Sequence, residues 1–272
     1  MVFDAAAPKV RVPDVASRKG HGEPLVMVTA YDAPSARVAA SSGADIILVG
    51  DSLGMVVLGY EDTLHVTLRD MATHTAAVAR TKPRQLLVSD LPWGTYHRGP
   101  DRAVNSAVKL VRAGAEAVKL EGGAKRLPVV RAILQAEVPV MGHLGLTPQS
   151  VHNMGGYRVQ GRAREAAKIL VEDAIALAEA GCFALVAEGV PAEVARELTS
   201  AVPVPVIGIG AGAACDGQVL VFHDVLGLAG AHKPRFVRRY AELEQVAVEA
   251  LRQWAADVRA GRFPGEAETY RA

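Results

Sequence analysis

The sequence is dominated by short runs rich in valine, isoleucine and leucine, each followed by a segment with helical spacing. This alternation is typical of repeated βα units around a parallel sheet, because parallel strands need crossovers and helices supply them. Eight runs are present: LVMVTA from Leu25, DIILVG from Asp45, QLLVSD from Gln85, EAVKLE from Glu116, VPVMGH from Val138, FALVAE from Phe183, PVIGIG from Pro205 and VLVFHD from Val219.

Four segments between these runs keep apolar residues on one helical face and end within two residues of a glycine or proline. They span 67–81, 100–113, 162–180 and 191–201, and Thr67 could cap the first of them. The stretch 142–161 has little helical period, and we expect it to be an ordered functional loop. Residues 1–24 are expected to form an N-terminal arm. A long C-terminal helix is expected over about 235–261, as a candidate for contacts between copies of the chain.

The length of 272 residues suits one α/β barrel with a filled core better than two compact domains. An open doubly wound sheet would show a similar alternation, but eight units in about 200 residues favour closure. We therefore predict a single (β/α)8 TIM barrel over residues 1–272.

Charge and cysteine content exclude several functions. Thirty Lys and Arg residues against 29 Asp and Glu residues give a net charge of +1, too little to attract nucleic acid or anionic lipid. Cys182 and Cys215 have no metal-ligand spacing and cannot form a disulfide framework, which favours a reducing cytoplasm. The N-terminal residues have scattered charges and no apolar stretch, so we expect neither a signal peptide nor a membrane anchor.

Ionisable residues end five consecutive predicted strands, at the face where such barrels place their active sites. A single carboxylate there could simply cap the next helix. Three carboxylates on adjacent strands repel one another unless a cation lies between them, and hard oxygen ligands suit Mg²⁺. We therefore predict a divalent metal held by Asp51, Asp90 and Glu121.

A bound Mg²⁺ keeps positions open for a chelating ligand, and a small 2-oxo acid offers carboxylate and ketone oxygens. Coordination of the ketone would acidify the adjacent carbon and favour an enolate. Glu188, on a separate strand, is the candidate base. Lys119 should face the barrel mouth with Glu121, to bind substrate or to pair with a carboxylate. His143 could orient a carboxylate, move a proton or fill a structural hydrogen bond.

A glycine run over residues 208–212 follows the seventh predicted strand, where many barrels bind phosphate through backbone amides. The run has no basic residue, so the glycines could equally serve a tight turn.

Several motifs at these strand ends resemble the ketopantoate hydroxymethyltransferase family from about Val26 to Glu268. They are TAYDAPSA from Thr29, LVGDSLGMVVLGYEDTLHVT from Leu48, SDLPWGTY from Ser89, VKLEGG from Val118, GHLGLTPQSV from Gly142, GGYRVQGR from Gly155 and IGIGAGAACDGQVLV from Ile207.

The resemblance implies a barrel of the phosphoenolpyruvate/pyruvate superfamily type, assembled as a homodecamer. It would transfer a hydroxymethyl group from 5,10-methylenetetrahydrofolate to 3-methyl-2-oxobutanoate, giving 2-dehydropantoate for pantothenate synthesis.

The resemblance also implies roles for individual residues. The Mg²⁺ ligands would be Asp51, Asp90 and Glu121. Substrate would be bound by Asp51, Ser52, Asp90 and Lys119, Glu188 would accept the proton, and His143 would belong to the site.

Two positions depart from the family pattern: His65 stands where proline is common, and Gly189 where cysteine is frequent. Neither removes a proposed catalytic group. Three other interpretations stay open. One is a related metal-dependent barrel that makes or cleaves a carbon–carbon bond in another 2-oxo acid, and another is a catalytically silent binding or scaffold protein. The third is a folate-dependent transfer without metal, which would leave the cluster of three carboxylates unexplained.

Overall fold

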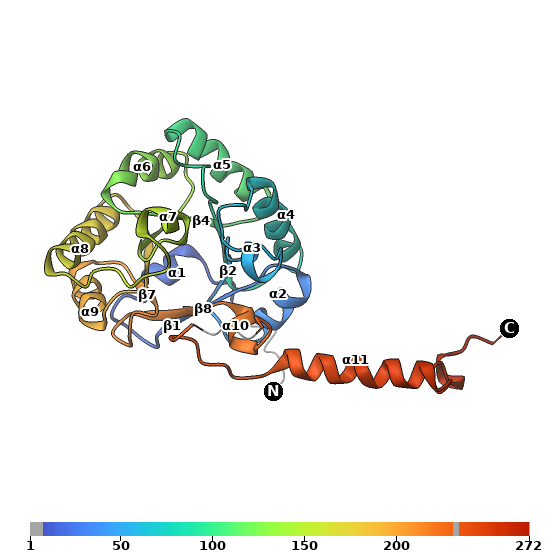
Figure 1. The fold of residues 1–272 in the computed structure, drawn as a ribbon. Helices are drawn as coiled ribbons and strands as arrows, with labels where there is room; N and C mark the ends of the chain where they lie inside the picture. The colour runs from blue at the N-terminus through green and yellow to red at the C-terminus, as the bar shows by residue number, and fades with distance from the viewer. Residues whose placement is uncertain (1–7, 231–233, 272) are drawn as a thin grey trace. The chain divides into compact units, whose positions relative to one another are not determined.

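The computed structural model describes residues 8–230 and 234–271. Eight parallel strands close into a barrel in sequence order, with β1 paired to β8, and helices surround the strands (Figure 1). The predicted (β/α)8 TIM barrel is confirmed, and an open sheet is excluded. The strands are β1 (Leu25–Thr29), β2 (Ile46–Val49), β3 (Leu86–Asp90), β4 (Ala117–Glu121), β5 (Val140–Gly145), β6 (Ala184–Glu188), β7 (Val206–Ile209) and β8 (Gly217–Leu220).

Longer helices follow the strands on the outside of the barrel: α2 (Ala33–Ala40), α4 (Leu68–Ala79), α5 (Pro100–Arg112), α6 (Leu127–Gln135), α8 (Arg164–Glu179) and α9 (Ala192–Ala201). Two short helices, α3 (Leu53–Val56) and α7 (Val151–Met154), lie inside the ring that these helices form (Figure 1). The four predicted helical segments correspond to α4, α5, α8 and α9. Thr67 caps α4 as expected, since its side chain accepts a hydrogen bond from the backbone N–H of Asp70.

Alternation along the strands produces two cores, because successive side chains point to opposite faces. Ile47, Val49 and Leu87 pack outward against the helices. Ile46 and Leu86 belong to a second cluster, of inward-facing residues that fill the barrel. Every second residue of a strand therefore points into the barrel. At the carboxyl end of the strand, the polar residues that keep this spacing point into the barrel mouth.

The predicted N-terminal arm contains a short helix, α1 (Val12–Ala16). Val15 on α1 is fully buried and joins the cluster of inward-facing strand residues. Lys9 Nζ donates to the carbonyl oxygen of Gln85 (2.7 Å) and pairs with Glu116. Residues 8–24 are thus attached to the barrel through apolar packing and an ion pair.

Two predicted segments differ from the structure. The loop expected over 142–161 starts inside β5 and contains a 3-10 helix, η2 (Pro148–Ser150), followed by α7. The run VLVFHD, expected as one strand, divides between β8 and the helix α10 (Phe222–Leu226). An apolar run of this length cannot by itself distinguish a buried strand from a buried helix turn.

Residues 223–272 form a second compact unit, separate from the unit over 1–222. Its main helix is α11 (Leu243–Arg259), so the C-terminal helix predicted over about 235–261 begins later than expected. The short 3-10 helix η3 (Glu266–Glu268) follows it. Among the described residues, no helix combines the length and apolar character that crossing a membrane requires.

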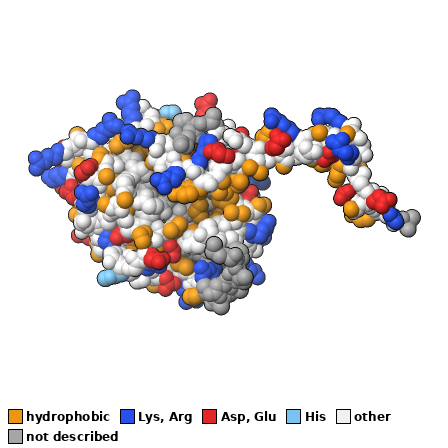
Figure 2. Space-filling view, turned by 90° about the horizontal axis from the view of Figure 1, so that it is seen from below, with side chains coloured by type: hydrophobic (Ala, Val, Ile, Leu, Met, Phe, Trp, Pro, Cys, Tyr) orange, Lys and Arg blue, Asp and Glu red, His pale blue; other side chains and the backbone are white. Residues whose placement is uncertain are grey.

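Figure 2 shows one face of the molecule, on which Lys and Arg side chains are interspersed with Asp and Glu side chains. This face therefore carries both signs of charge, as the near-neutral composition leads one to expect.

Candidate active site

Strand geometry brings the predicted site residues to the carboxyl end of the barrel. Asp90 ends β3, Lys119 and Glu121 end β4, His143 lies on β5, and Glu188 ends β6. Each of the five lies an even number of residues after an inward-facing strand residue, so its side chain also points into the barrel. Asp51 follows β2 on the same side. Glu188 is partly exposed, whereas the others are at most 5% exposed, so the cluster lies at the bottom of the mouth.

Negative charge predominates in this cluster. Burial raises the pKa of Asp51 well above its usual value, and the nearby carboxylates of Asp90 and Glu121 raise it further. Burial alone would lower the pKa of Lys119, but Asp90, Glu121 and Asp51 together raise it. Lys119 Nζ lies 3.0 Å from Asp90 Oδ1. The lysine is therefore a buried cation facing three carboxylates, and a further cation would relieve their repulsion.

His143 connects two carboxylates. Its Nδ1 lies 3.4 Å from Glu121 Oε1, and its Nε2 lies 3.2 Å from Glu188 Oε2. Burial and the neighbouring Lys119, 3.3 Å from Nδ1, favour the neutral ring, but the contacts with Glu121 and Glu188 outweigh them and raise the pKa of His143 to about 9. The two carboxylates thus favour the charged form of the ring that lies between them.

The turn after β2 is built for close approach to Asp90. The backbone N–H of Asp51 donates to Asp90 Oδ2 (3.1 Å). A side chain on Gly50 would lie 3.5 Å from that same oxygen and 2.9 Å from Ser52 Oγ, so glycine keeps the turn open. Ser52 Oγ lies 2.8 Å from the hydroxyl of Tyr31. The Gly50-Asp51-Ser52 turn therefore sets Asp51 beside Asp90.

The carboxylates fit a hard divalent cation chemically. Asp90 Oδ1 is shielded from solvent and accepts no well-directed hydrogen bond from the described residues, although Lys119 Nζ is near. Such an orphaned buried acceptor is suited to a metal ion. Within the part of the chain that the structure describes, however, no three His, Cys, Asp or Glu side chains already form a cage. Protein oxygens would thus supply only part of the shell, as is usual for Mg²⁺.

The cluster contains two further residues, Gln149 and Tyr96, which were not predicted from the sequence because they do not end a strand. The side chain of Gln149, in η2, donates from Nε2 to Asp51 Oδ2 (2.8 Å). The hydroxyl of Tyr96 donates to Gln149 Oε1 (2.7 Å). Both lie inside motifs that carried the resemblance, SDLPWGTY and GHLGLTPQSV, but in loops rather than at strand ends.

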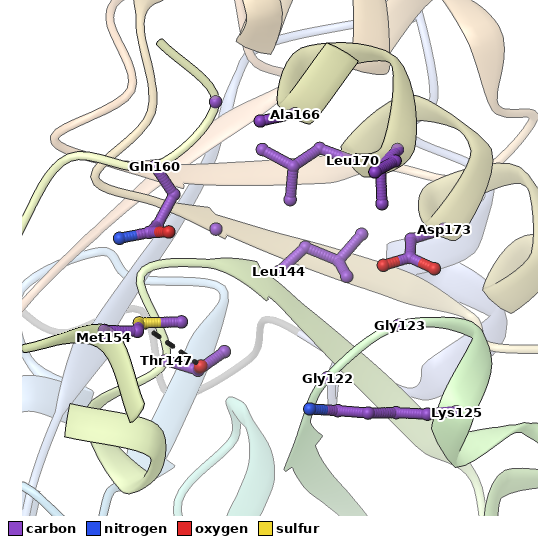
Figure 3. A pocket seen from close by; sticks show the side chains of 13 residues that line it. Gly122, Gly123, Lys125, Leu144, Thr147, Met154, Gln160, Ala166, Leu170 and Asp173 are labelled. Carbon is purple, nitrogen blue, oxygen red and sulfur yellow. Dashed lines mark hydrogen bonds between the residues drawn. The ribbon is translucent and has the colours of Figure 1, made fainter. Parts of the chain in front are cut away.

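A separate cavity of about 240 Å³ is lined by residues that follow β4, by β5 and by α8 (Figure 3). Its lining includes Gly122 and Leu144, which directly follow Glu121 and His143 in the chain. Leu144 is next to His143 on β5 and therefore points to the opposite face of the strand, away from the barrel interior. This cavity thus lies on the outside of β5 and faces α8. Asp173 and Gln160 are its polar lining residues on the α8 side (Figure 3).

The glycine run after β7 has packing roles. A side chain on Gly208 would lie 2.8 Å from Cys215 Sγ, and one on Gly212, where φ is +80°, would lie 2.7 Å from Ala192 Cβ.

The two residues that depart from the family pattern, His65 and Gly189, both fit their surroundings in the structure. Gly189 takes a left-handed φ of +55°, and His65 Nδ1 lies 3.0 Å from Asp62 Oδ1.

The closed barrel and the polar cluster at its mouth define the class of protein: a (β/α)8-barrel enzyme. The model of the family described as ketopantoate hydroxymethyltransferase matches residues 9–266, and the chain belongs to that family. It is accordingly a hydroxymethyltransferase.

Two similar proteins can be aligned with this chain over nearly their whole lengths. The 3-methyl-2-oxobutanoate hydroxymethyltransferase 2 of Bradyrhizobium diazoefficiens is 54% identical over 263 residues, which are 97% of this chain and 90% of that protein. The 3-methyl-2-oxobutanoate hydroxymethyltransferase of Ignicoccus hospitalis is 54% identical over 258 residues, 95% of this chain and 98% of that protein.

A solved structure shows the same fold at much lower identity. It is 2,3-dimethylmalate lyase, a member of the PEP mutase/isocitrate lyase superfamily, with a TM-score of 0.60 at 18% identity, covering 95% of this chain and 91% of that one. The likeness concerns the fold alone, a (β/α)8 barrel.

Proposed function

We propose that the protein transfers a hydroxymethyl group from 5,10-methylenetetrahydrofolate to 3-methyl-2-oxobutanoate, giving 2-dehydropantoate for pantothenate synthesis. Family membership and the names of the relatives support this reaction. The observation that carries it is the buried cluster at the mouth, where carboxylates, a lysine and a histidine converge.

Asp51, Asp90 and Glu121 would hold a divalent cation such as Mg²⁺. The raised pKa of Asp51 supports this role, because burial and the charges of Asp90 and Glu121 disfavour its ionised form more than Lys119 favours it. Asp90 Oδ1, whose contact with Lys119 Nζ at 3.0 Å is not well directed, would also accept a cation. When bound there, the cation supplies Lewis acidity that draws charge from the ketone of the substrate. Asp51 and Asp90 would also border the bound 2-oxo acid.

Glu188 would accept the proton from C3 of the oxo acid. It is the most exposed carboxylate of the cluster and comes from a strand other than those of the proposed ligands. Its Oε2 lies 3.2 Å from Nε2 of the buried His143, and this contact would hold the carboxylate in place. Lys119 and Ser52 would orient the substrate, Lys119 through its charge and Ser52 through its hydroxyl.

Water would hydrolyse the methylene group of the folate, breaking its bonds to N5 and N10 and releasing tetrahydrofolate and formaldehyde. The C3–H bond of the oxo acid breaks and its proton passes to Glu188. The enolate carbon then adds to the formaldehyde carbon, whose oxygen takes up a proton and becomes the new hydroxyl group. The protein groups would position the partners and carry the proton, which is how general acid–base catalysis contributes to rate.

Exchange of the C3 proton in deuterated water tests the first half of this reaction without folate. We expect 3-methyl-2-oxobutanoate to exchange only with enzyme and Mg²⁺ present. Glu188→Gln should lower the exchange rate at least about a hundredfold while leaving binding of the oxo acid nearly unchanged. Exchange at the normal rate in this variant would remove Glu188 as the base.

The same assay separates the alternative functions. A silent scaffold would show no exchange under any condition. A related barrel acting on another 2-oxo acid would exchange a different substrate and would not form 2-dehydropantoate when methylenetetrahydrofolate is added. If the hydroxymethyl transfer needs no metal, the rate of 2-dehydropantoate formation would be the same with and without a chelator.

We further propose that the enzyme is a cytoplasmic homo-oligomer, with the decamer implied by the family resemblance. The free thiols of Cys182 and Cys215 support a reducing location. Within α11, apolar residues at 243, 247, 250, 251, 254 and 258 recur at three- and four-residue spacing, the pattern of a helix that packs on one face. Light scattering coupled to size exclusion would give the number of subunits.

A further inference from the structure

Gln149 occupies a buried position between the strand ends. It lies in η2, directly after β5, and is only 4% exposed. Its side-chain amide has every hydrogen-bonding group satisfied: Nε2 donates to Asp51 Oδ2 (2.8 Å) and to the carbonyl oxygen of Leu91 (3.0 Å), and Oε1 accepts from Tyr96. A buried amide with no free group is held in one orientation.

The neighbouring groups determine which way the amide points. The backbone N–H of Glu121 donates to the hydroxyl oxygen of Tyr96 (3.2 Å). The hydroxyl of Tyr96 has two acceptors within reach, and Gln149 Oε1 at 2.7 Å is much nearer than the carbonyl oxygen of Glu121 at 3.4 Å. An amide rotated by half a turn would set its N–H₂ against this donor and its oxygen against two acceptors. Tyr96 thus fixes the amide so that it donates toward Asp51.

Gln149 contacts a second carboxylate through its main chain. Its backbone N–H donates to Glu121 Oε2 (3.0 Å). One residue therefore restrains Asp51 and Glu121, which come from different strands and repel each other. Gln149 therefore occupies one oxygen of each carboxylate, Oδ2 of Asp51 and Oε2 of Glu121. The other oxygen of Glu121, Oε1, lies 3.4 Å from His143 Nδ1.

We propose that Gln149 is a positioning residue that holds Asp51 and Glu121 ready for a divalent cation, with Tyr96 fixing the orientation of its amide. The inference rests on the proposed function, because it takes these carboxylates as ligands. Hydrogen bonds to ligating carboxylates set their orientation, and losing such a bond costs about ten- to a hundredfold in metal affinity.

The test is binding of Mn²⁺ to the full-length enzyme, measured by titration calorimetry and by the paramagnetic resonance signal of free Mn²⁺, with no substrate present. Gln149→Met keeps the side-chain length and the backbone N–H but removes the bond to Asp51. We expect about a tenfold or larger rise in the Kd for Mn²⁺ at an unchanged number of sites per chain. Tyr96→Phe should give a smaller rise.

Gln160→Met is the matched control. Gln160 follows in the same connection after β5, and its Nε2 donates to the carbonyl oxygen of Arg158 (2.8 Å) rather than to a carboxylate. We expect its Kd for Mn²⁺ to equal that of the wild type. Partial unfolding would lower the number of sites per chain without raising the Kd of the folded fraction, so the two effects are distinguishable.

Two results would overturn the inference in different ways. Equal Kd values for the wild type, Gln149→Met and Tyr96→Phe would show that Gln149 does not position the ligands, while the metal site itself would stand. A wild-type enzyme that binds no Mn²⁺ would remove the proposed metal site together with this inference. If Gln149→Met does not fold, Tyr96→Phe alone carries the test.

Discussion

Replacing Lys119 with methionine should destabilise the fold, because the change removes the buried cation of the mouth while preserving much of its apolar length. Lys119 Nζ lies 3.0 Å from Asp90 Oδ1, and Asp51 and Glu121 also act on it. At this distance an effective dielectric constant of about 20 gives an attraction of roughly 5 kcal/mol. Breaking a buried pair by removing one partner typically costs about 3–5 kcal/mol.

Urea unfolding in the presence of a chelator would measure this cost. We expect Lys119→Met to lower the free energy of unfolding by about 3–5 kcal/mol near pH 8. The deficit should shrink at lower pH. Carboxylates left without a cation have raised pKa values in the folded state, so the folded variant binds more protons than the unfolded chain and gains stability as the pH falls.

Lys168→Met provides the control. Lys168 lies on α8, 64% exposed, and pairs with Glu172 at 3.7 Å. A solvent-exposed pair of this kind contributes less than about 1 kcal/mol. Equal stability losses in Lys119→Met and Lys168→Met, or a deficit for Lys119→Met that does not change with pH, would refute the view that Lys119 neutralises buried carboxylates.

Three further variants test other parts of the site. Asp90→Asn should weaken the Mg²⁺ dependence of C3 exchange at least about tenfold, and an unchanged metal titration would remove Asp90 from the ligands. His143→Gln should lose most stability below pH 6.5 and little above a pH of about 9, because the raised pKa of His143 stabilises the fold only while the ring is charged; equal losses in urea unfolding at both extremes would contradict this. Gly145→Ala should cost more than about 1 kcal/mol and slow exchange, since φ is +90° and the new Cβ would meet the carbonyl oxygen of Glu188. Gly94→Ala, at φ +82° with open space around it, should show the backbone penalty alone.

The barrel and the residues of its mouth could be predicted from the sequence because both depend on the strands, along which side-chain direction repeats every two residues. Successive side chains along a strand point to opposite faces, so Lys119 and Glu121, two residues apart, are expected to point the same way. The structure accordingly places Asp90, Lys119, Glu121, His143 and Glu188 at one end of the barrel, facing inward.

Gln149 and Tyr96 could not be predicted in the same way. Both lie outside the strands, where no repeating period relates sequence position to direction. Their contacts depend on how the loops after β3 and β5 fold over the strand ends, which is set by tertiary packing. The helix α10 was missed for a related reason, since a short apolar run favours strand and helix about equally.

Closure of the barrel through β1 and β8 has a consequence for synthesis of the chain. Every candidate site residue, from Asp51 to Glu188, leaves the ribosome before β8 does, yet β1 pairs with β8 from Leu25 opposite Gly217. A nascent chain ending before Gly217 would hold all the catalytic groups but leave β1 and β7 as open edges. Pairing between such distant segments is slow to form, so the late-made strand determines how long those edges stay open to association with other chains.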